Sequence, residues 1–208
     1  MGRPPRYAEA EILEGAKHVS AEVGPGKLTI ARIAKRTGMP VGSIYHRYAS
    51  RDAILAEVWL ELVEEFQEQF LAELGAANTV QAGLAAVRFA CRWIRLHPRE
   101  ARLLLLHRRE DFASDRWPTS YRRRAEALAG RGAAALGDYA ARLTSQRGAA
   151  VLRTVRFALI DLPTSVLRRD VEAGTPPPEA VEDLLVDTCA HVLRRAARAI
   201  PKPKSKRR

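Results

Sequence analysis

Side chains that can bind a phosphate backbone gather in one short stretch near the N-terminus, between residues 29 and 51. Hydroxyl, imidazole and guanidinium groups donate hydrogen bonds to phosphate oxygens, and the stretch offers Thr29, Tyr45, His46 and Arg51 for this role. Alternative roles are a partly buried structural aromatic for Tyr45, and a surface salt bridge with Asp52 or Glu57 for Arg51. The stretch therefore predicts contact with a nucleic-acid backbone.

Between these donors lies a run of small and apolar side chains suited to close approach to base edges. The run is Met39, Pro40, Val41, Gly42 and Ser43, with Arg32 and Arg47 as longer neighbours. Gly42 permits close approach of the backbone, Val41 can touch a thymine methyl group, and Ser43 can donate or accept a hydrogen bond. Because long polar side chains are few here, we expect the bases to be read weakly.

The elements that must present these side chains are two short helices joined by a tight turn. Thr29 is a good N-cap for the first helix, and Gly38 followed by Pro40 ends it. Apolar residues recur at helical spacing, namely Ile30, Ile33 and Ala34 in the first helix and Val41, Ile44 and Tyr48 in the second. Such a pair is typical of a helix-turn-helix, whose second helix lies in the major groove of DNA.

This pattern resembles the N-terminal domain of the tetracycline-repressor (TetR) family. Over about residues 6–59, the resemblance is carried by Thr29, Ile33, Ala34, Gly38, Gly42, Ile44, Tyr45, Tyr48, Arg51, Ile54 and Leu55. Pro40 and Val41 stand where many members carry small polar residues, and Tyr48 replaces a common Phe. The resemblance implies an all-α protein, with a helix-turn-helix domain at 1–52 and a larger helical domain at 53–200 that binds a ligand and dimerises.

Composition argues against several other classes of protein. A chain of 208 residues with 47% hydrophobic content can bury a core as one unit or two. Cys91 and Cys189 lack metal-ligand spacing, so we expect buried thiols and no disulfide, metal or cofactor. No apolar run approaches the roughly 20 residues that span a bilayer, and the start has no apolar signal core. We therefore expect a cytoplasmic protein with no membrane contact.

Positive charge is concentrated at the two ends of the chain. Of the formal net charge of +11, residues 1–52 contribute +4, the tail 201–208 contributes +5, and the 148 residues between them contribute +2. Basic charge beside a recognition element raises affinity for phosphate through counterion release. The tail is expected to be a solvated disordered end or a non-specific contact to DNA. Arg3 and Arg6 are expected to form a minor-groove arm or a frayed terminus.

Hydrophobic periodicity and the positions of glycine and proline predict helices along the remaining chain. We expect them at about 5–23, 50–74, 80–96, 99–112, 120–143, 149–170 with a kink or interruption at Pro163, and 179–199. Apolar stripes mark the last two, namely Leu152, Val155, Leu159, Leu162 and Val166, then Val181, Leu185, Thr188, Val192 and Ala196. The resemblance implies a homodimer formed through these stripes, with recognition helices about 34 Å apart or somewhat more. The alternative is that both stripes face the subunit's own core.

The resemblance also implies a small-molecule cavity among the middle helices. Its expected lining residues are Trp59, Phe66, Phe89, Trp93, His107, Phe112, Trp117, Tyr121, Phe157 and Asp161. Aromatic residues at helical spacing are more often ordinary core, and that alternative stands for each of them.

Three functions fit these observations. The leading hypothesis is a ligand-responsive regulator, a repressor that binds a palindromic operator as a dimer and is released by an unidentified small molecule. The second is a DNA-binding protein without sequence preference, which both basic ends favour. The third is a helical enzyme, but Asp161 and the histidines at 18, 46, 97, 107 and 191 form no recognisable acid–base, nucleophile or metal pattern.

Overall fold

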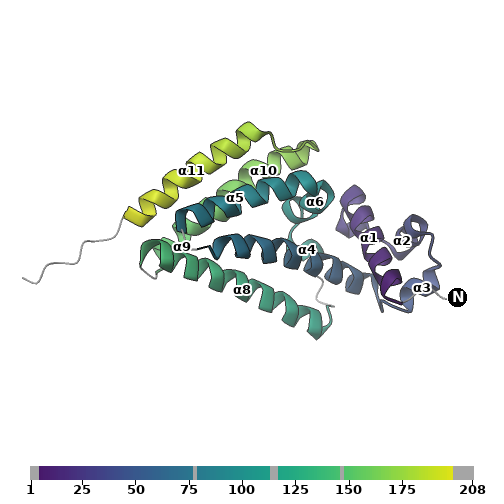
Figure 1. Cartoon of the computed structure of the whole chain (residues 1–208). Coiled ribbons are helices and arrows are strands. Elements are labelled where there is room, and N and C mark those ends of the chain that lie inside the picture. Colours follow the sequence, from purple (N-terminus) through teal and green to yellow (C-terminus); the bar gives the residue numbers. More distant parts are fainter. Residues whose placement is uncertain (1–4, 77–78, 113–116, 146–147, 199–208) are drawn as a thin grey trace, which may run out of the picture. The chain divides into compact units, whose positions relative to one another are not determined.

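The computed structural model describes residues 5–76, 79–112, 117–145 and 148–198, with the backbone alone for residues 5–8. All the regular elements in this part are helices, as the sequence predicts (Figure 1). They are α1 (Pro5–Val23), η1 (Pro25–Lys27), α2 (Ile30–Thr37), α3 (Val41–Tyr45), α4 (Arg51–Leu74), α5 (Thr79–Leu96), α6 (Pro98–Leu106), α7 (Arg109–Phe112), α8 (Thr119–Thr144), α9 (Ala149–Arg156), η2 (Phe157–Asp161), α10 (Leu162–Ala173) and α11 (Glu179–Arg198). Within the same ranges, no helix is both long and apolar enough to cross a membrane. Arg3, the side chain of Arg6 and the tail at 201–208 lie outside the described residues.

Two predicted helices are divided in the structure. The first divides into α6 and α7 because the backbone of His107 is extended, with φ −119° and ψ 146°. Asp111 then accepts a hydrogen bond of 2.7 Å from the backbone N–H of Arg108 at the start of α7. The second divides at η2, a π-helical turn that ends two residues before Pro163. Proline has no N–H, and its ring clashes with the carbonyl four residues earlier, so the wider turn accommodates it.

The helices form two compact units. The first comprises residues 1–66 and 96–128, and the second comprises residues 67–95 and 129–208. Segment 96–128, which the sequence places in the larger domain, therefore groups with the helix-turn-helix. The reason is a shared core, in which Phe112, Trp117 and Leu128 pack in one cluster with Ile12 and Ile44. The predicted boundary at residue 52 differs from this grouping.

Three helices of the second unit pack closely at Gly83 of α5. Tyr139 of α8 is fully buried, and its hydroxyl donates a hydrogen bond of 2.7 Å to the carbonyl of Thr79. A Cβ atom on residue 83 would lie 2.3 Å from that hydroxyl oxygen and 2.8 Å from Cδ1 of Leu193 in α11. Since real Cβ contacts are not this short, the packing of α5 with α8 and α11 requires glycine at this position.

Both cysteines are buried in the second unit, as predicted, and we expect them to be unreactive in the folded protein. Burial raises the pKa of each thiol from the ordinary 9.0 to about 11. At pH 8 the reactive thiolate should thus be about a hundredfold scarcer than in the unfolded chain, and disulfide-exchange reagents should label Cys91 and Cys189 correspondingly slowly. Because folding favours the neutral thiols, their contribution to stability is present below pH 9 and falls as the pH rises towards 11. Equal labelling rates in native buffer and in denaturant would contradict this burial.

Candidate nucleic-acid interface

The helix-turn-helix begins and ends where the sequence predicts. Thr29 has extended backbone angles, and its Oγ1 accepts a hydrogen bond of 3.2 Å from the backbone N–H of Arg32. Gly38 adopts the left-handed conformation with φ 72°, and its N–H donates to the carbonyl of Ala34 at 2.9 Å. Both predicted ends of α2 are confirmed, and they fix the turn that leads into α3.

Helix α1 supports this pair of helices (Figure 1). A Cβ atom on Gly15 would lie 2.5 Å from Cγ2 of Thr37, so α1 and α2 are in close contact there. Ile12 of α1, Ile33 of α2 and Ile44 of α3 are each fully buried. The apolar residues of α1, α2 and α3 thus share one core, which holds the turn and α3 in place.

Most residues predicted to meet DNA lie on the surface. Thr29, Arg32, Pro40, Val41, Gly42, Tyr45 and His46 are exposed, whereas Met39, Ser43 and Arg47 are half-buried. Tyr45 is 53% exposed and Val41 is 42% exposed. Val41 shares the helical spacing of Ile44 and Tyr48, and the expectation that all three are buried together is wrong for Val41. Helix α3 has five residues, and its buried residues are Ile44 and, just beyond it, Tyr48.

Arg47 differs from its exposed neighbours. Its Nη1 donates a hydrogen bond of 3.0 Å to the carbonyl of Ser43, and its Nε is buried with no hydrogen-bond partner among the described residues. The side chain lines a hollow of about 480 Å³ whose other walls include Glu9, Tyr48 and Glu57. In this arrangement Arg47 is only partly available to a ligand at the exposed face of α3.

Arg51 is engaged within the protein. Its Nε donates to the carbonyl of Leu28 at 2.7 Å, and its Nη2 donates to the carbonyls of Pro25 at 2.7 Å and Gly26 at 3.1 Å. Its Nη1 pairs with Asp52 at 3.1 Å, so the alternative of a salt bridge with Asp52 is confirmed. The expected phosphate clamp would have to compete with these bonds for the same donors.

Further basic side chains were missed in the sequence interpretation. Lys27, Lys35 and Arg36 are exposed on η1 and α2, close in sequence to Arg32. Spacing of three and four residues from Arg32 places Lys35 and Arg36 near it on a helix, and this signal was available in the sequence. Arg36 is also 3.2 Å from Nδ1 of His18 in α1, so it has a partner within the protein.

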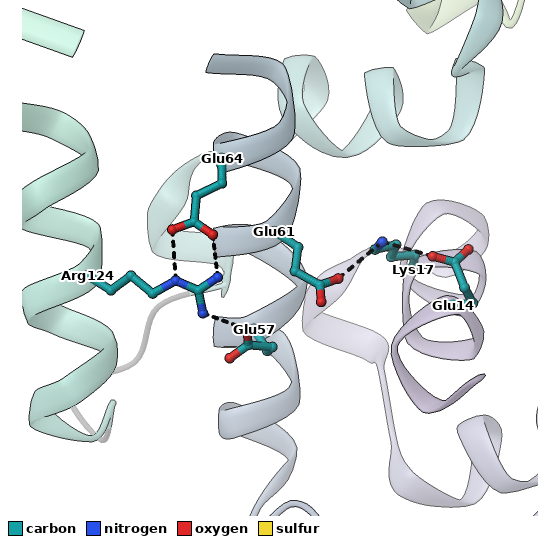
Figure 2. Close-up of polar contacts among 6 residues, drawn as sticks. All are labelled: Glu14, Lys17, Glu57, Glu61, Glu64 and Arg124. Atoms are coloured by element: carbon teal, nitrogen blue, oxygen red, sulfur yellow. Dashed lines mark hydrogen bonds and ion pairs between the residues drawn. The ribbon is translucent and has the colours of Figure 1, made fainter. Parts of the chain in front are cut away.

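An ion-pair network on α4 joins α1 and α8 within the first unit (Figure 2). Arg124 of α8 makes a two-pronged contact with Glu64 and a further one of 2.6 Å with Glu57. Nζ of Lys17 in α1 lies 3.2 Å from Glu61 and 2.8 Å from Glu14.

The carboxylates of this network keep its cations charged. Burial lowers the pKa of Lys17, but Glu14 and Glu61 outweigh burial and raise it. The hydrogen bond with Glu64 is the main cause that raises the pKa of Arg124. Both cations stay charged and hold their helices on α4.

The residues expected to line a ligand cavity divide between the two units. Trp59, Phe66, His107, Phe112, Trp117 and Tyr121 belong to the first, and Phe89, Trp93, Phe157 and Asp161 belong to the second. Phe112 and Trp117 form part of the first unit's core, so the alternative of ordinary core holds for them. Phe157 and Asp161 are exposed. Neither unit therefore contains all ten residues that were expected to line the cavity.

The stripes expected at a dimer interface are partly used inside the subunit. Val155, Leu159 and Leu185 are at most 2% exposed, so they pack in the second unit's own core. The remaining members are exposed or half-buried, namely Leu152, Leu162, Val166, Val181, Thr188, Val192 and Ala196. Leu184, which the sequence interpretation missed, is 64% exposed and lies three residues from Val181 and four from Thr188. This spacing gives α11 an exposed apolar side.

The fold and the arrangement of α1–α3 define an all-helical protein with an N-terminal helix-turn-helix. Residues 12–58 match the family of bacterial regulatory proteins called the tetR family. The HTH-type transcriptional repressor AcnR of Corynebacterium jeikeium (strain K411) is 34% identical over 74 residues, which cover 35% of this chain and 39% of that protein. The chain thus spans less than half the length of this relative.

Solved structures extend the likeness to the rest of the fold. A TetR-like transcriptional regulator from Rhodococcus sp. RHA1 gives a TM-score of 0.69 at 15% identity, covering 96% of this chain and 99% of that one. FadR from Bacillus subtilis in complex with stearoyl-CoA gives a TM-score of 0.60 at 17% identity, covering 85% and 97%. The helix-turn-helix region of the chain is therefore similar to the tetR family, and the whole chain shares the fold of these solved structures.

Proposed function

We propose that this protein is a DNA-binding transcriptional regulator without catalytic activity, most simply a repressor. The observation that carries the proposal is the exposure of the helix-turn-helix residues that can meet DNA. They are the hydrogen-bonding residues Thr29, Tyr45 and His46 and the small residues Pro40, Val41 and Gly42. Exposed Lys27, Arg32 and Lys35 add positive charge on the adjoining elements, and such charge favours phosphate. Residues 12–58, which include this face, match the tetR family of bacterial regulatory proteins.

A symmetric dimer on a palindromic operator is the second part of the proposal. The support is the apolar side of α11 at Val181, Leu184 and Thr188, together with Leu152 and Phe157, which are 37% and 46% exposed. Contiguous exposed apolar patches mark surfaces that bind other proteins, and we propose that these residues form such a patch. A two-fold dimer would present two recognition helices to successive major grooves.

Release by a small molecule is the third part. Its support is the FadR structure from Bacillus subtilis, which is in complex with stearoyl-CoA and has the same fold, with a TM-score of 0.60 at 17% identity. A ligand releases DNA only to the extent that it prefers the conformation with misaligned recognition helices. A thermal-shift screen followed by an operator-release assay would identify such a ligand.

Tyr45→Ala is expected to weaken DNA binding at least about tenfold, because it removes an exposed ring and a hydroxyl that can donate to a charged phosphate. The measurement is an anisotropy titration with DNA from upstream of the protein's own gene, with mixed-sequence duplex as competitor. Tyr45→Phe is the matched control, and it separates the hydroxyl from the ring. Unchanged affinity in Tyr45→Ala would place the binding surface elsewhere.

The same titration separates the alternatives. A sequence-reading dimer should leave a symmetric footprint and prefer its operator strongly over the competitor. Equal affinity for both duplexes would favour a protein without sequence preference. A monomer that binds neither duplex at low salt would end the proposal.

A further inference from the structure

Arg51 opens α4 at a place that its own helix disfavours for a cation. The N-terminus of a helix carries partial positive charge, so acidic residues stabilise it and basic residues do not. The first turn already has a cap, because Oγ of Ser50 accepts a hydrogen bond of 3.1 Å from the backbone N–H of Ala53. Neither the dipole nor the cap therefore accounts for an arginine at this position.

The contacts of Arg51 do account for it. A guanidinium has five N–H donors, and four bonds to Pro25, Gly26, Leu28 and Asp52 use four of them. Three of the acceptors are main-chain carbonyls of the connector between α1 and α2. Charge-assisted bonds of this kind are among the stronger ones in proteins, and the planar fork of arginine reaches several acceptors at once.

The connector sets the start of α2. Leu28 is fully buried and directly precedes Thr29, the N-cap residue. The carbonyl of Leu28 belongs to the peptide unit whose nitrogen is that of Thr29, so a bond from Arg51 to this carbonyl orients the residue that caps α2. The first residue of α4 thus fixes the entry to the helix-turn-helix.

We infer that Arg51 is a positioning residue for α2 rather than a phosphate ligand. The inference rests on the proposed DNA-binding function for its consequence, but its structural part can be tested without DNA. Arg51 holds the carbonyls of Pro25, Gly26 and Leu28, and thereby keeps Thr29 and the N-terminus of α2 in the orientation that meets DNA.

The test compares Arg51→Lys and Arg51→Ala in the full chain, with Lys35→Ala as the control that removes an exposed cation from α2. Lysine keeps the positive charge but lacks the planar guanidinium group that reaches several acceptors at once. Amide hydrogen exchange without DNA should accelerate at least about tenfold at Leu28, Arg32 and Ile33 in both Arg51 variants. Exchange in α5 and α11 should stay at the wild-type rate, which separates local loosening from global unfolding. Lys35→Ala should leave exchange unchanged throughout.

DNA binding supplies the second readout, with a labelled mixed-sequence duplex of about two helical turns at several salt concentrations. Positioning predicts that Arg51→Lys binds as weakly as Arg51→Ala, and that the salt slope in Arg51→Lys is unchanged. A phosphate ligand predicts near-wild-type binding by Arg51→Lys and a slope reduced by about one in Arg51→Ala. Wild-type exchange and wild-type affinity in Arg51→Lys would overturn the inference. If the wild-type protein binds no DNA, the proposed function fails, whereas the exchange rates still decide whether Arg51 holds α2.

Discussion

Gly83→Ala is expected to lower the free energy of unfolding of the second unit by about 2 kcal/mol, within the range for overpacked cores. The added methyl group would lie 2.3 Å from the hydroxyl oxygen of Tyr139 and 2.8 Å from Cδ1 of Leu193. Tyr139 is fully buried, and its hydroxyl is bonded to the carbonyl of Thr79, so it cannot move without losing that bond. Chemical denaturation followed by circular dichroism would measure the loss.

Gly130→Ala is the matched control. Gly130 lies within α8, and a Cβ atom there would meet nothing within 4 Å. Alanine is the better helix former by about 1 kcal/mol, so this variant should gain stability while Gly83→Ala loses it. If the two variants changed stability in the same direction, the close approach of α5 to α8 and α11 would be wrong.

Two glycines, Gly38 and Gly83, illustrate which structural roles one sequence can predict and which it cannot. Gly38 is identifiable from the sequence because it follows an amphipathic helix and precedes a proline, and both signals are local. Gly83 has no local signal, since the sequence shows a glycine inside a helical pattern and nothing of Tyr139 or Leu193. The first and last residues of α1, α4 and α11 are also predictable from local signals, namely apolar periodicity and the capping or helix-breaking residues beside it.

The residues of the candidate site also differ in whether a local signal predicts their role. The N-cap role of Thr29 follows from residue type and spacing, and the structure confirms it. The engagement of Arg51 with Leu28 and Pro25 depends on how a connector folds back on α4, which no periodicity predicts. The grouping of segment 96–128 with the helix-turn-helix was missed for the same reason, because Phe112 and Trp117 join the core cluster that contains Ile12 only in the folded chain.

Arg124→Glu is expected to destabilise the first unit by about 2 kcal/mol. Removing one partner from a buried pair costs several kcal/mol, whereas an exposed pair contributes about 0–1 kcal/mol. The side chain of Arg124 is 36% exposed, and those of Glu57 and Glu64 are 20% and 33% exposed, so the expected value lies between these limits. The substitution also places a third carboxylate beside two that have lost their main counter-charge (Figure 2).

Arg123→Glu makes the same change of charge at the neighbouring, exposed position of α8 and should alter stability by no more than about 0.5 kcal/mol. The charge exchange Arg124→Glu with Glu64→Arg should recover part of the loss, because it restores one opposite-charge pair, and the double-mutant cycle isolates that pair. The loss in Arg124→Glu should shrink as ionic strength rises, since the network is partly open to solvent. Equal effects of the substitutions at 123 and 124 would mean that Arg124 acts through net charge alone, and the attachment of α8 to α4 would then depend on the apolar contacts of Ala125 and Leu128.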